Sequence, residues 1–79
     1  MSNRIIPDVG SGKNLKRLRK NAGLTQEQAA TKLQLLGLSV SREMLSQMER
    51  DQYNIKVSIL LALGEIYEAP LDEFFKGLF

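Results

Sequence analysis

Two helix-start signals in the middle of the chain, at Thr25 and Ser41, constrain the fold more than any other feature of the sequence. A threonine or serine in this position accepts a hydrogen bond from the backbone N–H groups that a helix start leaves free. Gln28 follows Thr25 at the spacing that lets its side chain reach back and complete a capping box. The signals therefore predict two short, consecutive helices, one that begins at Thr25 and one over residues 42–50.

Each of these two helices has an apolar face. In the first, Ala29, Ala30 and Leu33 fall on one side. In the second, Leu45 and Met48 form an apolar stripe. The opposite face of the second helix carries polar side chains, namely Arg42, Glu43, Ser46 and Gln47. Two short helices, the second with a row of hydrogen-bonding side chains, are the arrangement of a helix-turn-helix DNA reader.

This part of the chain resembles the XRE family, the phage-repressor and Cro type of helix-turn-helix domain. The resemblance is carried by Leu24-Thr25-Gln26-Glu27, by Ala30, Leu33 and Val40-Ser41, and by Leu45-Ser46-x-Met48-Glu49-Arg50. It continues from Leu60 to Phe75 and covers roughly residues 12–78. The family implies an all-α fold, a compact five-helix domain like that of lambda repressor, which we place at residues 12–79.

The connection between the two central helices departs from the usual family pattern. A typical member has a single glycine between the positions of Leu33 and Val40, whereas this chain has the longer segment 34–39. Leu35, Leu36 and Leu38 are too apolar for an exposed loop, so we expect the first helix to continue to Leu36 and to break at Gly37. A subset of the family resembles this lengthened form. The sequence does not determine the angle between the two helices.

The resemblance also implies roles for individual residues. Arg42, Glu43, Ser46 and Gln47 are expected to face the bases of the major groove, and Lys16, Arg17 and Gln26 the phosphates. Arg19 is expected to form a structural ion pair with Glu49, which would hold the first helix of the domain against the helix over residues 42–50. For Lys16 and Arg17 the alternative is a solvated helix face, and for Arg42 and Gln47 it is simple exposure to solvent.

The last third of the chain is apolar at helical spacing. A helix over residues 57–68, with Leu60, Leu63 and Ile66, is expected at the centre of the bundle. A fifth helix is expected from Pro70, a favourable first helical residue. The apolar side chains that follow are Leu71, Phe74, Phe75 and Leu78. Most of them suit a core role, and the excess suggests either a homodimer contact through this helix or a linker to something else.

Composition limits the function. The chain has no cysteine and no histidine, which removes disulfides, thiolate zinc sites and the commonest general base, so we expect no enzyme, no metal and no cofactor. The net charge is +2, and most basic residues precede residue 24. This asymmetry suits a protein that turns one end toward a polyanion, here double-stranded DNA. No small-molecule site is evident.

The first eleven residues are interrupted by Pro7 and Gly10 and predict a flexible N-terminal arm, either disordered or in contact with DNA or a partner. No apolar run reaches the ~18 residues of a membrane span, and no signal-peptide core is present, so we expect no membrane partner and a cytoplasmic location. Together these features predict a sequence-specific DNA-binding transcriptional regulator, a repressor. The alternative is a protein-interaction module, such as an antitoxin or antirepressor, with the same fold.

Overall fold

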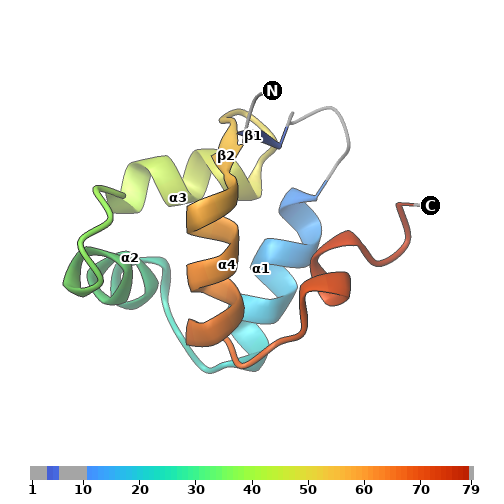
Figure 1. Cartoon of the computed structure of the whole chain (residues 1–79), viewed down its shortest axis with the longest axis horizontal. Coiled ribbons are helices and arrows are strands. Elements are labelled where there is room, and N and C mark those ends of the chain that lie inside the picture. Colours follow the sequence, from blue (N-terminus) through green and yellow to red (C-terminus); the bar gives the residue numbers. More distant parts are fainter. Residues whose placement is uncertain (1–3, 6–10, 79) are drawn as a thin grey trace.

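A computed structural model of the chain describes residues 4–5 and 11–78. Within this part the chain forms four α-helices, α1 (Gly12–Asn21), α2 (Gln26–Leu35), α3 (Arg42–Glu49) and α4 (Val57–Ile66). A 3-10 helix, η2 (Leu71–Phe75), follows α4. Figure 1 shows α4 at the centre of the view, with α2 to its left, α3 crossing its upper end, and α1 and η2 to its right. The domain is mostly helical, as the sequence predicts.

We expected a fifth α-helix to begin at Pro70, but the segment forms only the short 3-10 helix η2. Its carbonyl groups accept hydrogen bonds from side chains of α1 as well as from backbone N–H groups of its own turns. Asn14 Nδ2 donates to the carbonyl oxygens of Phe74 and Lys76, at 3.0 and 2.9 Å. Arg17 donates to the carbonyl oxygen of Glu73 at 3.1 Å. These bonds tie the segment to α1, and the extended backbone of Lys76, at φ −60° and ψ 129°, ends it after Phe75.

Both predicted helix starts are confirmed. The Thr25 hydroxyl accepts from the backbone N–H of Gln28, and the Gln28 side chain accepts from the backbone N–H of Thr25, which completes the capping box. The Ser41 hydroxyl accepts from the backbone N–H of Met44. These caps fix where α2 and α3 begin and therefore which faces of the two helices are buried.

The end of α2 agrees with the prediction, but the burial of its leucines does not. Leu36 is the C-cap residue, and Gly37 follows with φ +83°, a left-handed conformation that favours glycine. Leu38 packs against the core. Leu35 and Leu36, however, are 81% and 56% exposed, so the expectation that these leucines are too apolar for the surface was wrong. The α2–α3 connection turns them outward.

The core lies between the four helices and η2. α4 contributes Ile59, Leu60 and Leu63, and the fully buried Phe74 of η2 closes the far side. A close backbone approach occurs at Gly12, where a Cβ atom would lie 2.5 Å from the carbonyl oxygen of Glu49. Only glycine allows α1 to start this close to the end of α3.

Two residues of the predicted arm are paired. Strand β1 (Arg4–Ile5) runs antiparallel to β2 (Ile55–Lys56), with Arg4 opposite Lys56 and Ile5 opposite Ile55. Ser11, the last residue of the predicted arm, is buried at the start of α1, and arm residues 1–3 and 6–10 lie outside the described part, so the flexibility of the arm stays a prediction. The pairing places the start of the chain beside the segment that leads into α4 (Figure 1).

Candidate nucleic-acid interface

The outer face of α3 presents the polar residues that the sequence singles out. Arg42 and Glu43 are exposed, and Ser46 and Gln47 are half-buried, whereas Leu45, Met48 and Glu49 point into the core. At about 100° per residue, Glu43 and Ser46 lie near the middle of this face, and Arg42 and Gln47 flank it. The structure therefore brings all four candidate base-contact residues to one surface, with the flanking pair on opposite edges.

Arg50 lies on the same surface, and the sequence analysis did not single it out. It follows Ser46 by one helical turn, is exposed, and its Nε donates to the carbonyl oxygen of Ser46 at 3.4 Å. The spacing of one turn from Ser46 was the available signal. Arg50 adds a cation to a face whose other charges are Arg42 and Glu43.

A buried ion pair holds α3 against α1. Arg19 Nε donates to Glu49 Oε2 at 2.7 Å, and Arg19 Nη2 donates to Glu49 Oε1 at 3.1 Å. Nη1 of Arg19 donates to the carbonyl oxygen of Leu24. The side chains are only 9% and 2% exposed, and the hydrogen bond to Glu49 raises the pKa of the Arg19 guanidinium above its usual value. The structure thus brings together the two residues expected to pair.

Gln26 joins the same carboxylate. Its Nε2 donates to Glu49 Oε1 at 3.1 Å, so the first turn of α2 is fixed to α3 through a side-chain bond. Gln26 is half-buried, at the position where the sequence predicts a phosphate contact. Its second amide hydrogen and its backbone N–H stand at the positive end of α2.

The two candidate phosphate ligands on α1 lie in different environments. Lys16 is exposed, as are Lys13 and Lys20, and together with Arg17 they border a shallow depression of about 370 Å³. Arg17 is half-buried, and its Nη1 lies 3.3 Å from Glu73 Oε1. The charge of Arg17 is therefore paired with Glu73 of η2, whereas the charge of Lys16 faces solvent.

A comparison with protein-family models finds one described as "Helix-turn-helix" that matches residues 15–74. The chain belongs to the XRE-type helix-turn-helix family. This is a family of DNA-binding regulators and not of enzymes. No curated protein and no solved structure gives a significant match to the chain. Membership in the subset with a lengthened connection stays a prediction.

In this XRE-type domain, Asp51 ends α3 in place of the glycine that such a turn favours. Its φ is +58°, in the left-handed region, which aspartate tolerates better than most residues. Its Oδ1 accepts from the backbone N–H of Gly12 at 2.9 Å. The Asp51 carboxylate thereby satisfies a free N–H at the start of α1, where Ser11 makes no side-chain cap.

Tyr67 lies behind the ion pair. Its hydroxyl is buried and has no hydrogen-bond partner among the described residues. Burial raises the pKa of Tyr67 well above its usual value, and the negative charge of Glu49 adds to the effect. Tyr67 thus remains uncharged and closes the apolar side of the Arg19–Glu49 pair.

No helix within residues 4–5 and 11–78 is long and apolar enough to cross a membrane.

Proposed function

We propose that the chain is a sequence-specific transcriptional regulator that represses genes by reading base edges with the outer face of α3. The supporting observation is the rigid mounting of this face: Glu49, at the end of α3, is bonded to both Arg19 of α1 and Gln26 of α2. Base readout requires side chains that are held in a fixed register relative to the duplex. The exposed polar face and its buried support together favour readout over mere solvation.

The side chains of this face match the donor and acceptor pattern of the major groove. Arg42 can donate two hydrogen bonds to guanine, Gln47 can pair with adenine, and Glu43 can accept from the amino group of cytosine. Ser46 is small enough to approach the edge of any of these bases. Arg42 and Gln47 lie at the two edges of the face, so they would contact different base pairs.

Phosphate contacts would come from the residues beside this face. Lys16 is the better candidate on α1 because it is exposed and forms no salt bridge with another described residue, and Arg17 is assigned a secondary role because Glu73 already holds it. Gln26 would contribute through the start of α2, where the helix dipole favours an anion. These contacts carry no base preference but set the register of α3 on the duplex.

The regulator is proposed to act as a homodimer in the cytoplasm. One recognition helix reads only a few base pairs, and two-fold related half-sites are the usual solution. The expected contact lies in the segment that forms η2, where Leu71 is 46% exposed and Leu78 is half-buried. Sedimentation of the protein with its selected DNA tests this, because a homodimer binds as two protomers per site.

The test of sequence readout is selection of bound sites from a random DNA pool. The parent chain should enrich one sequence, and Arg42→Ala and Gln47→Ala should each lose the preference at a different position, with a cost of about 1–3 kcal/mol on the best site. Glu65→Ala, an exposed change on α4, is the matched control and should select the parental sequence. Unchanged preferences for both α3 variants would contradict the assignment.

Repression is tested separately, by placing the selected site between a promoter and a reporter gene. The parent chain should lower reporter output, and Arg42→Ala should not. An increase in output would make the protein an activator.

An interaction module, such as an antitoxin or antirepressor, is the second candidate. The observation in its favour is the exposed apolar surface of Leu35 on α2, Leu61 on α4 and Leu71 on η2. The same selection decides between the two, because an interaction module with a vestigial α3 would enrich no sequence.

A further inference from the structure

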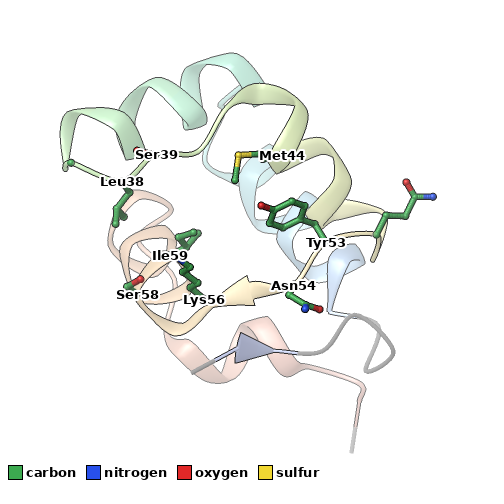
Figure 2. A pocket seen from close by; sticks show the side chains of 10 residues that line it. Leu38, Ser39, Met44, Tyr53, Asn54, Lys56, Ser58 and Ile59 are labelled. Carbon is green, nitrogen blue, oxygen red and sulfur yellow. The ribbon is translucent and has the colours of Figure 1, made fainter. Parts of the chain in front are cut away.

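A pocket of about 570 Å³ opens beside α3, and Met44 is the residue of α3 that lines it. Three segments enclose it: the α2–α3 connection at Leu38, the turn after α3 at Tyr53, and the start of α4 at Ile59 (Figure 2). Met44 of α3 points into the same space (Figure 2). The volume lies in the range of sites that hold small organic ligands.

The lining is apolar at the base and polar at the rim. Leu38, Met44 and Ile59 are half-buried or buried and form the base. The rim consists of exposed hydroxyl and amide side chains, including Ser39, Asn54 and Ser58, which make no side-chain hydrogen bond within residues 11–78. A few free polar groups above an apolar base are typical of ligand sites.

One charge faces the pocket. Lys56 is the sole charged residue among those that line it in the described part of the chain, and no carboxylate accompanies it. Lys56 forms no salt bridge with another described residue. A ligand with an apolar body and one negative charge would therefore meet complementary groups at both ends.

The α2–α3 connection builds one wall of this pocket. Gly37, Leu38 and Ser39 all line it. Gly37 adopts a left-handed conformation, and the backbone N–H of the next residue, Leu38, bonds to the carbonyl oxygen of Leu33. This bond ties the wall of the pocket to the last turn of α2.

From this geometry we infer that the pocket is a binding site for a small organic anion with an apolar body, such as an aromatic or acyl carboxylate. Its apolar part lies on Leu38, Met44 and Ile59, and its carboxylate faces Lys56. The inference goes beyond the proposed DNA binding and does not depend on it, because ligand binding is measured on the free protein. The sequence alone gave no sign of this site, since its lining comes from segments far apart in the chain.

The test is a titration of the isotope-labelled full chain, followed by the NMR shifts of its backbone amides. The probes are 2-naphthoate, its neutral counterpart 2-naphthamide, and inorganic phosphate. Naphthoate should shift the amides of Leu38, Met44 and Ile59 and should bind more tightly than naphthamide, by up to about fivefold, the upper end of the range expected of one partly exposed charge pair. Phosphate should bind more weakly than naphthoate because it leaves the apolar base unfilled.

Two variants and a control sharpen the result. Lys56→Gln should remove the preference for naphthoate over naphthamide, and the matched change Lys20→Gln on α1 should preserve it. Ser58→Phe places a large side chain at the rim and should weaken both aromatic probes. Shifts centred on the exposed Leu35, Leu36 and Leu61, no saturation up to the millimolar range, or phosphate binding as tight as naphthoate would each overturn the proposal.

Discussion

Arg19 and Glu49 show what a buried charge pair does for a small domain. The pair joins α1 to α3 through two short hydrogen bonds, and both side chains are almost fully removed from solvent. Removal of one partner leaves the other charge buried and uncompensated, which is far more costly than removal of both. The contribution of the pair is therefore best measured by a double-mutant cycle.

We expect Arg19→Ala and Glu49→Ala each to lower the free energy of unfolding by ~3–5 kcal/mol. The double variant should lose much less than the sum of the two single losses, because the residues share one interaction. Chemical denaturation of the four proteins gives the coupling energy. Arg50→Ala, an exposed arginine next to Glu49 in sequence, is the control and should change stability little. Additive losses would mean that the contact contributes no coupling.

For individual residues, the sequence predicted contacts between neighbours in the chain and missed several contacts between residues that are far apart in the chain. The capping residues Thr25 and Ser41 act within their own helix turn, so their spacing is visible in the chain. Asp51 caps a helix that begins 39 residues earlier, and no local pattern reveals such a partner. Gln26 was assigned to phosphate, and its bond to Glu49 depends equally on the tertiary fold.

Among the elements, η2 differs most from the prediction. Its apolar residues repeat at helical spacing, which is why a fifth α-helix was expected from Pro70. Phe74 and Phe75 do face the core, so the periodicity reported burial correctly. Asn14, which lies 60 residues from Phe74 in the chain, adds a tertiary hydrogen bond at the end of the segment. Periodicity predicts which side chains are buried, but it does not distinguish a short 3-10 helix from an α-helix, because both bury residues three positions apart.

We expect Asn14→Ala to release η2 from α1. The variant removes two hydrogen bonds and leaves the carbonyl groups of Phe74 and Lys76 without their donor, at a cost of about 1–3 kcal/mol. Amide hydrogen exchange should accelerate at Lys76 and Leu78, whose N–H groups form the last turns of the chain.

The control for this variant is Asn21→Ala, an exposed asparagine at the end of the same helix. It should leave exchange in η2 unchanged. Equal protection of Lys76 and Leu78 in the Asn14 variant and the parent would show that Phe74 packing and the Arg17–Glu73 contacts are enough to hold η2 in place.

For the whole molecule, the charge distribution is the feature that the sequence predicted best. The exposed cations Lys13, Lys16 and Lys20 cover one side of α1. The structure adds a distinction that composition does not contain, since neighbouring Arg17 is neutralised by Glu73. Charges that face solvent attract a polyanion, whereas a charge already paired contributes less.

We expect Lys16→Ala to weaken binding to every DNA sequence by a similar factor and to reduce the slope of log K against log salt by about 0.9, because one fewer counterion is released. Arg17→Ala is the matched comparison on the next residue of α1. It should alter the salt slope less and should lower the thermal midpoint more, because it breaks the contact with η2. Equal salt slopes for Lys16→Ala and the parent would place α1 away from the DNA.

The close approach at Gly12 has a mechanical consequence for α3. Near Glu49 the helix is clamped to α1 by the ion pair, by the Asp51 carboxylate and by direct backbone contact. Near Met44 it borders an open pocket. The helix is therefore held by polar and backbone contacts near Glu49 and mainly by the packing of Leu45 and Val40 near its start. A tilt of α3 about Glu49 displaces the tip of Arg42 more than that of Gln47, so we expect tolerance of altered bases to be graded along the site, greatest where Arg42 reads it.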